Sequence, residues 1–294
     1  MAFLCVDIGG TNTLIGVGNG EFQITRNVKT ENFLERVDEN IEDALSEAGY
    51  RPEDVGKVAA AVAGPLDRKE GVFRPPNIDD LDEVQIVEPL ENFGEVVFVN
   101  DCTSAVAGEY YYGDDELENI AYITISSGIG MGAVIDGEIV EGWNGNLGEV
   151  GHMVVGSEGI KCGCGGTDHW EAYCSGNGMP KLAEKLFGAE FQDSLEIFQS
   201  CDLGEENACK TIEKVQEYNK RGFMNIIDLF NPGKVYVGGA VALNHFNTVV
   251  EEPVDEIGSE TINEVPEFEK STLGDEVVLH GLRAVCNGEF ELSS

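Results

Sequence analysis

Short apolar runs separated by turns dominate the first part of the chain. A buried run at residues 3–8, a second at 13–19 and an alternating segment at 21–30 predict three consecutive strands. Apolar side chains at helical spacing over residues 31–49, ending at a glycine, predict one helix. Runs at 57–64 and 96–101 predict two further buried strands, and residues 103–113 predict the helix that follows.

The same order of elements then begins again. Strands are predicted at residues 119–125 and 131–136 around a glycine turn, followed by a long helix at 205–230, a strand at 234–239 and a helix at 245–257. This recurrence indicates two α/β domains with a cleft between them. We place the first domain at residues 1–114, completed by a C-terminal helix at 275–294, and the second at residues 115–274.

The charge balance narrows the possible partners. The chain has 55 acidic and 18 basic residues, a formal net charge of −37. The acids are spread through amphipathic segments, so they indicate a charged surface over the whole fold rather than an acidic tail or a disordered segment. General nucleic-acid binding, which needs a basic surface, is excluded. Because about 1 M salt screens such self-repulsion, we expect a halophilic protein from a salt-accumulating cytoplasm.

The cellular compartment follows from the apolar runs and the cysteines. No run of about 18 apolar residues is present, and the N-terminus lacks the basic segment of a signal peptide, so we expect a cytoplasmic protein without a membrane partner. In a reducing cytosol, eight cysteines do not predict a disulfide framework. Cys162 and Cys164 form a tight pair that favours metal binding, whereas Cys5, Cys102 and Cys286 lie in apolar stretches as small hydrophobic residues do.

Two glycine-rich turns open the two halves of the chain. Residues 7–12 read D-I-G-G-T-N after a predicted strand, and residues 126–130 read S-S-G-I-G at the equivalent place. Glycines let backbone N–H groups approach a phosphate, Thr11 adds a hydroxyl donor, and Asp7 suits Mg²⁺. Neither a P-loop nor a dinucleotide-binding motif is present. One such turn is typical of an ordinary hairpin, but two indicate a pair that grips one polyphosphate.

Four motifs, taken in their order along the chain, resemble those of the ROK family (repressors, open reading frames and sugar kinases). They are the two glycine-rich turns, Asn100-Asp101 after a buried strand, and G-N-L-G-E-V-G-H at residues 145–152. The resemblance covers Cys5 to about residue 285. It implies two actin-like (ribonuclease H-like) domains with the active site in the interdomain cleft. The residues that it assigns to ATP and Mg²⁺ are Asp7, Gly9, Gly10, Thr11, Asn12, Ser126, Ser127, Gly128, Gly130, Gly238 and Gly239.

Asp101 is the candidate catalytic base. A carboxylate at a strand end can accept the proton of a hydroxyl that attacks the γ-phosphate of ATP. Taken alone, Asp101 also suits the cap of the helix predicted from Thr103. The resemblance implies sugar contacts from Gly64, Asn77, Asn100, Asp101, Glu149, His152 and Glu171. Asn77 is equally typical of a turn after two prolines, and Glu149 of a solvated charge.

A structural zinc site is predicted within residues 152–169. His152, Cys162, Cys164 and His169 have the spacing H-x9-C-x-C-x4-H, and thiolates with imidazoles suit tetrahedral Zn²⁺. The similar ROK pattern has cysteine where this chain has His169, and glycine where it has Asp168. The fourth ligand is therefore open among His169, Cys174 and Asp168, and a loop without metal is the remaining alternative.

These features together predict an ATP-dependent hexose kinase. Glucokinase activity, which forms glucose 6-phosphate, is the first expectation, and an N-acetylhexosamine, fructose or mannose kinase is the alternative. A ROK repressor is disfavoured because the first glycine turn begins at residue 7, which leaves no room for a DNA-binding domain, and because the surface is acidic. A non-catalytic sugar-binding or zinc scaffold protein is disfavoured by the intact turns and Asp101. The resemblance also implies a homo-oligomer, a dimer or tetramer.

Overall fold

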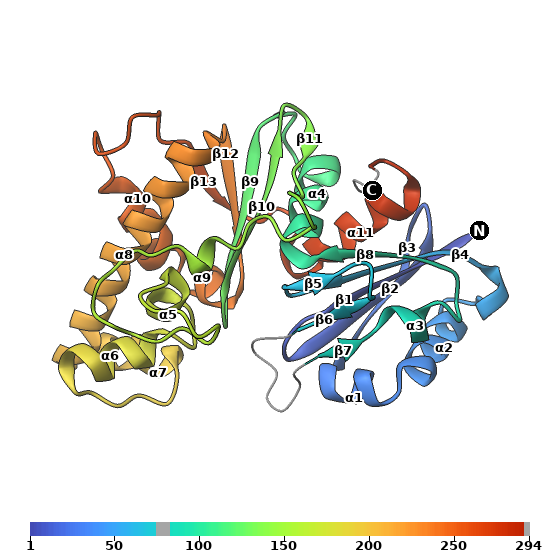
Figure 1. Ribbon diagram of the computed structural model, residues 1–294, viewed down its shortest axis with the longest axis horizontal. Helices are drawn as coiled ribbons and strands as arrows, with labels where there is room; N and C mark the ends of the chain where they lie inside the picture. Colours follow the sequence, from blue (N-terminus) through green and yellow to red (C-terminus); the bar gives the residue numbers. More distant parts are fainter. Residues whose placement is uncertain (75–82, 291–294) are drawn as a thin grey trace. The chain divides into compact units, whose positions relative to one another are not determined.

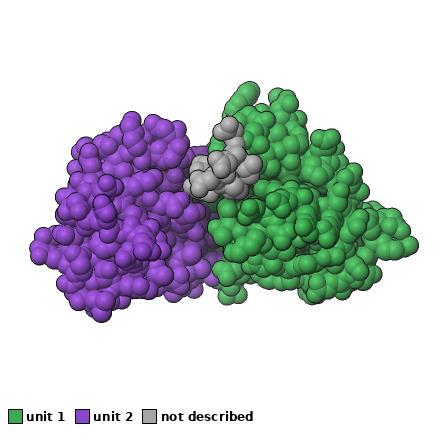
Figure 2. All heavy atoms as spheres, turned by 90° about the horizontal axis from the view of Figure 1, so that it is seen from below, with its two compact units in different colours: residues 1–116, 139–147, 272–294 green, residues 117–138, 148–271 purple. Residues whose placement is uncertain are grey.

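The computed structural model describes residues 1–74 and 83–290, and the chain forms two compact units (Figure 2). Unit 1 consists of residues 1–116, 139–147 and 272–294, and unit 2 of residues 117–138 and 148–271. The segment 139–147, which the sequence analysis placed in the second domain, lies in unit 1. Asn77, a candidate sugar contact, lies outside the described residues.

Unit 1 is built on a five-stranded sheet of order β3-β2-β1-β4-β8 (Figure 1). β1 pairs antiparallel with β2 and parallel with β4, and β4 pairs parallel with β8. The strands are β1 (Ala2–Ile8), β2 (Asn12–Asn19), β3 (Glu21–Lys29), β4 (Val55–Val62) and β8 (Glu95–Asn100), with a small second sheet of β5 (Leu66–Asp67), β6 (Val72–Phe73) and β7 (Val84–Gln85). The helices are α1 (Thr30–Glu35), α2 (Val37–Glu47), α3 (Val87–Leu90), α4 (Asp101–Tyr112), α11 (Val277–Asn287) and the 3₁₀ turns η1 (Pro52–Asp54) and η4 (Gly274–Glu276).

Helices cover both faces of the unit 1 sheet, which explains why its central strands are apolar without alternation. Alternate residues of β1 point to opposite faces. Leu4, Val6 and Ile8 pack with the apolar side chains of α1 and α2, whereas Phe3 and Cys5 pack with those of α11. The five main strands predicted for this unit are confirmed.

Helices α4 and α11 approach each other more closely than side chains allow. A Cβ added to Gly281 would lie 1.7 Å from the carbonyl oxygen of Ser104, and one added to Gly108 would lie 2.4 Å from that of Val277. Glycine at these two positions therefore lets the two backbones pack directly together. A C-terminal helix was predicted at residues 275–294, and the observed helix is shorter, Val277–Asn287.

Unit 2 repeats the strand order, with a five-stranded sheet of order β11-β10-β9-β12-β13. β9 and β10 are antiparallel, whereas β12 runs parallel to both β9 and β13. The strands are β9 (Ile120–Ile125), β10 (Ile129–Ile135), β11 (Glu138–Ile139), β12 (Lys234–Gly238) and β13 (Glu267–Lys270). The helices are α5 (Trp170–Cys174), α6 (Met179–Phe187), α7 (Ser194–Asp202), α8 (Glu206–Phe230), α9 (Ala240–Asn244), α10 (Glu252–Asp255), the 3₁₀ turn η2 (Val150–His152) and the π-helix η3 (Asn247–Glu251).

Two local predictions are wrong. The single helix at 31–49 is divided at Arg36, whose φ of −142° is not helical; the Asn40 side chain donates a 2.8 Å hydrogen bond to the carbonyl of Arg36. The predicted helix at 245–257 is confirmed, although its first part is a π-helix, followed by one turn of α-helix. The expectation of no disulfide fails for Cys201 and Cys209, because the turn between α7 and α8 brings their Cα atoms within 4.7 Å and the two sulfurs are bonded.

Candidate functional site

Three strand ends bring the predicted catalytic residues of unit 1 to one edge of its sheet. β1, β4 and β8 are parallel, so their carboxyl ends lie together, with Asp7 opposite Ala61 and Asn100 opposite Val62. Gly64 follows β4 at the same edge, and the peptide bond from Gly64 to Pro65 is cis. This edge therefore gathers two carboxylates and an amide beside the first glycine turn.

Asn100, rather than Asp101, caps helix α4. Its Oδ1 accepts hydrogen bonds from the backbone N–H groups of Cys102 (2.9 Å) and Thr103 (3.2 Å). Asp101 is the first residue of the helix, and its Oδ1 accepts from the Cys102 N–H at 2.7 Å. The capping role that sequence reasoning offered as the alternative for Asp101 thus belongs to its neighbour.

The two carboxylates at this edge interact electrostatically. Burial, followed by the negative charge of Asp101, raises the pKa of Asp7 to about 8. A carboxyl group with a raised pKa stays protonated at neutral pH unless a bound cation stabilises its ionised form. Asp7 and the neighbouring Asp101 therefore have the chemistry of a Mg²⁺ site, because a divalent ion would offset both the burial and the repulsion.

A buried threonine pair, which the sequence analysis missed, holds the first glycine turn. The Gly9 N–H donates to the Asn12 carbonyl at 3.1 Å, which closes the turn between β1 and β2. Thr30 Oγ1 donates to the Gly9 carbonyl at 2.7 Å and lies 3.1 Å from Thr13 Oγ1. Gly10, Thr11 and Asn12 are exposed, so their N–H groups can reach a phosphate. Thr30 begins a helix 18 residues beyond the turn in sequence, and no motif signalled its role.

The second glycine turn and the predicted adenosine contacts share one edge of the unit 2 sheet. Ser126, Ser127 and Gly128 connect β9 to β10, and the Ser126 N–H donates to the Gly128 carbonyl at 2.9 Å. Gly238 ends β12, which neighbours β9. A Cβ on Gly238 would lie 2.0 Å from the Tyr122 hydroxyl, and Gly239 has a φ of +89°, so both positions require glycine. The geometry brings these glycines beside the turn.

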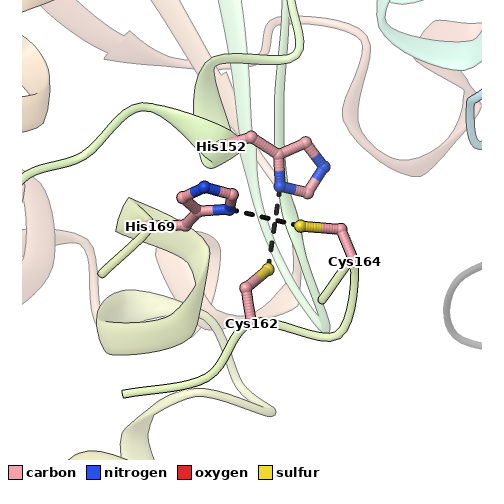
Figure 3. Close-up of side chains that lie close together, drawn as sticks. All are labelled: His152, Cys162, Cys164 and His169. Atoms are coloured by element: carbon pink, nitrogen blue, oxygen red, sulfur yellow. Dashed lines mark hydrogen bonds between the residues drawn. The ribbon is translucent and has the colours of Figure 1, made fainter. Parts of the chain in front are cut away.

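Four predicted metal ligands converge in unit 2 (Figure 3). The ligand atoms of His152, Cys162, Cys164 and His169 all lie within 4.8 Å of one another. His152 Nδ1 is 3.7 Å from Cys162 Sγ, and His169 Nδ1 is 3.3 Å from Cys164 Sγ. Zinc at about 2.3 Å from sulfur and about 2.0 Å from nitrogen holds a tetrahedral S···N pair about 3.6 Å apart. The residues therefore fit a tetrahedral zinc ion.

The other candidates for the fourth ligand have different partners. Cys174 is fully buried in the core of unit 2, and its Sγ lies 3.5 Å from the Val215 carbonyl oxygen. Asp168 adopts a φ of +64°, the left-handed region that favours the glycine expected there. Its Oδ1 accepts from the N–H groups of Gly159 (2.6 Å) and Ile160 (3.1 Å) and from Tyr173 Oη (2.5 Å). Asp168 thus ties the loop together, and His169 completes the cluster.

The ionisation of the cluster follows from its surroundings. Burial raises the pKa of the Cys162 thiol to about 12, so a bound metal ion has to displace its proton. Burial and the charge of His152 lower the pKa of His169, which favours the neutral imidazole that binds metal. The hydrogen bond to Glu149 raises the pKa of His152. Its Nε2 faces Glu149 Oε2 at 3.4 Å, so this carboxylate orients the ring whose Nδ1 faces the cluster.

Glu171 joins the metal-ligand cluster to the second glycine turn. Its Oε1 lies 3.7 Å from Cys162 Sγ, and its Oε2 accepts a 3.1 Å hydrogen bond from the Ile129 N–H, where the turn enters β10. The Gly176 N–H also donates to the Ser126 carbonyl at 2.7 Å. The predicted sugar contacts of unit 2, Glu149, His152 and Glu171, therefore surround one structural centre.

Comparison with known proteins assigns the family. The model of the ROK family matches residues 3–288. The chain belongs to the ROK family. Glucokinase from Pyrobaculum calidifontis is 32% identical to this ROK chain over 288 residues, 97% of the chain and 94% of the relative. N-acetylmannosamine kinase from Shigella flexneri is 29% identical over 83% of the chain and 84% of the relative.

Solved ROK structures share the fold over nearly the whole length. The ROK hexokinase from Thermus thermophilus matches with a TM-score of 0.81 and 30% identity, over 98% of this ROK chain and 99% of that one. The ROK glucokinase from Streptomyces griseus, in complex with glucose and AMPPNP, matches with a TM-score of 0.75 and 25% identity, over 97% and 99%. The predicted α/β fold of the ROK type is confirmed. No described helix combines the length and apolarity needed to cross a bilayer.

Proposed function

We propose that this ROK chain is an ATP-dependent hexose kinase that forms glucose 6-phosphate. The observation that carries the proposal is the edge of the unit 1 sheet, where Asn100 caps α4 and leaves Asp101 beside the half-buried Asp7. The glucokinase relatives and the glucose-bound Streptomyces griseus structure support glucose as the substrate. The N-acetylmannosamine kinase relative favours an N-acetylhexosamine as the second candidate.

In the proposed reaction, the sugar hydroxyl oxygen bonds to the γ-phosphorus as the bond to the β-phosphate oxygen breaks, and ADP leaves. Asp101 accepts the hydroxyl proton. The two glycine turns, at residues 9–12 and 126–130, donate backbone N–H groups to the phosphates, and Gly238-Gly239 bind the adenosine side. When bound, Mg²⁺ neutralises phosphate charge, and Asp7 is proposed to hold it directly or through water.

The proposed sugar contacts are the residues that the ROK motifs imply, Gly64, Asn77, Asn100, Asp101, Glu149, His152 and Glu171. Zinc bound by His152, Cys162, Cys164 and His169 is structural in this proposal. It holds the loop whose residues present hydrogen-bonding groups to the sugar.

A coupled assay of ADP release tests the activity. Glucose, fructose, mannose, N-acetylglucosamine and N-acetylmannosamine are supplied with ATP and Mg²⁺ in molar KCl. We expect the highest kcat/KM with glucose and its loss in Asp101→Asn, while Asp38→Asn, an exposed carboxylate on α2, serves as the matched control. Preference for an N-acetylhexosamine would select the second candidate, and no ADP release with any sugar would refute the kinase.

We also propose a cytoplasmic, salt-adapted homo-oligomer. The net charge of −37 supports salt adaptation, because repulsion among surface carboxylates is screened only at high ionic strength. Circular dichroism during dialysis from molar to millimolar KCl tests this, and an unchanged folded state would refute it. Light scattering on the protein as it elutes from a size-exclusion column gives the oligomeric state. A monomer would refute the proposed homo-oligomer.

A further inference from the structure

A lysine-lined cavity in unit 2 adjoins the metal-ligand cluster. It has a volume of about 560 Å³, and its charged lining residues are Lys161, Lys181, Lys185 and Glu184. Lys181 and Lys185 belong to α6, where a spacing of four residues places them on one face of the helix. Lys161 comes from the loop that directly precedes Cys162, which also lines the cavity. Two separate segments thus direct positive charge toward one concave surface.

The three lysines form no ion pair, a property that they share with Lys29, Lys57, Lys69, Lys270 and Arg283 among the described residues. Within the described residues, ion pairs are formed by Arg26, Arg36, Arg51, Arg68, Arg74, Lys210, Lys214, Lys220, Arg221 and Lys234. Across the same residues, no ion pair involves Lys161, Lys181 or Lys185; Lys161 Nζ donates instead to the neutral Thr167 Oγ1 at 2.9 Å. Three of these unpaired lysines line one cavity, where Glu184 is the single acidic lining residue.

The charge of this cavity is opposite to that of the surrounding protein. In two other cavities, of about 460 and 440 Å³, the charged lining residues are mainly acids: Glu35, Asp38 and Glu39 beside Arg36 in the first, and Glu251, Asp255 and Glu267 in the second. Like charges gathered in one concavity repel one another, and an anion that binds among them removes this cost. The lysine-lined cavity is therefore built for negative charge.

We propose that the lysine-lined cavity binds a multiply charged oxyanion of the phosphate class. Lysine ammonium groups bind phosphate as point charges and need no fixed geometry. The nearby N–H groups of Gly159 and Ile160 already donate to Asp168 Oδ1, so the lysines supply the contacts. Because Lys161 immediately precedes Cys162, a bound anion also restrains the loop that carries a metal ligand. Anion binding should therefore slow the loss of zinc to a chelator.

Calorimetric titration of inorganic phosphate into the full zinc-loaded chain tests the proposal. Excess Mg²⁺ and AMPPNP occupy the proposed nucleotide site, and KCl holds the ionic strength constant. We expect saturable binding that weakens at least about tenfold in the double variant Lys181→Gln/Lys185→Gln. Lys57→Gln, an exposed lysine of unit 1 without an ion pair among the described residues, should leave the affinity unchanged.

Lysine acetylation followed by mass spectrometry locates the anion in the wild-type chain. Phosphate should slow acetylation of Lys161, Lys181 and Lys185 but not of Lys57. Stronger protection by glucose 6-phosphate than by inorganic phosphate would identify a phosphate ester as the ligand, and the reverse order would identify the free anion. Both results support the proposal.

Three results would overturn it. The first is an affinity that the double variant leaves unchanged, and the second is equal protection by chloride at the same ionic strength. The third is self-association of the chain that the double variant abolishes, because the lysines would then contact the acidic surface of a second copy. If the double variant does not fold, the single variants Lys181→Gln and Lys185→Gln at these exposed positions provide the same affinity comparison with the wild type.

Discussion

When it is ionised, the half-buried carboxyl group of Asp7 opposes the stability of the fold. Its pKa is about 8 in the folded chain, against an ordinary value of 3.8, because of burial and then the charge of Asp101. The folded state therefore binds this proton more tightly than the unfolded chain does, and the contribution of Asp7 to stability is lost as pH rises from about 4 to about 8. One pKa unit is worth about 1.4 kcal/mol, so ionised Asp7 costs at most about 6 kcal/mol.

Asp7→Asn removes this cost, because asparagine has the shape of the protonated carboxyl group and stays neutral. Without Mg²⁺, the free energy of unfolding of the variant should exceed that of the wild type by about 1.6 kcal/mol at pH 5, where Asp7 is already ionised in the unfolded chain, and by up to about 6 kcal/mol at pH 9. Urea unfolding followed by circular dichroism at constant KCl measures both values. Asp38→Asn, at an exposed position, should change stability by only a few tenths of a kcal/mol at either pH. An equal effect of Asp7→Asn at pH 5 and pH 9 would refute the reasoning.

Three further substitutions test the proposed site. Asp101→Asn should lower turnover at least about 100-fold while sugar affinity, measured by calorimetry, stays close to wild type; near-normal turnover would reject Asp101 as the base. Cys162→Ser should remove about one equivalent of zinc measured by mass spectrometry after dialysis, and Cys286→Ser should retain it; equal zinc contents would contradict the site. Glu171→Gln should weaken Mg²⁺–nucleotide binding about fivefold in the absence of sugar, because the Ile129 N–H loses a charged acceptor. An unchanged nucleotide affinity with a weakened sugar affinity would limit Glu171 to the sugar.

Strand positions were readable from the sequence because local pattern determines them. The central strands β1 and β4 are buried on both faces, so their apolar runs stand out, and their order along the chain repeats in unit 2. The break at Arg36 and the π-helix at Asn247–Glu251 depend on individual hydrogen bonds, which the spacing of apolar residues does not report. The assignment of residues 139–147 to unit 1 depends on tertiary contacts, which the local sequence pattern does not report either.

The metal-ligand cluster was predictable from the sequence, because metal binding requires particular side chains at a particular spacing. The metal ligands converge as their spacing predicted, and the left-handed conformation of Asp168 explains why glycine is expected at that position. Residues that act through a neighbour carried no signal. Thr30 holds the first glycine turn from a distant helix, and Asn100 takes the cap that spacing alone offered to Asp101.

Unit 1 cannot be completed until α11 has been synthesised, after all of unit 2. Its sheet packs on α11, where Leu279 and Leu282 meet Phe3 and Cys5 from the opposite end of the chain. A nascent polypeptide that has emerged only to residue 116 therefore exposes one apolar face of β1 and β4 to water. Residues 117–271, which contain all of unit 2, leave the ribosome before that face is covered. Helix α11, which is translated after unit 2, thus closes the unit that was begun first, and a chaperone has time to bind the open face.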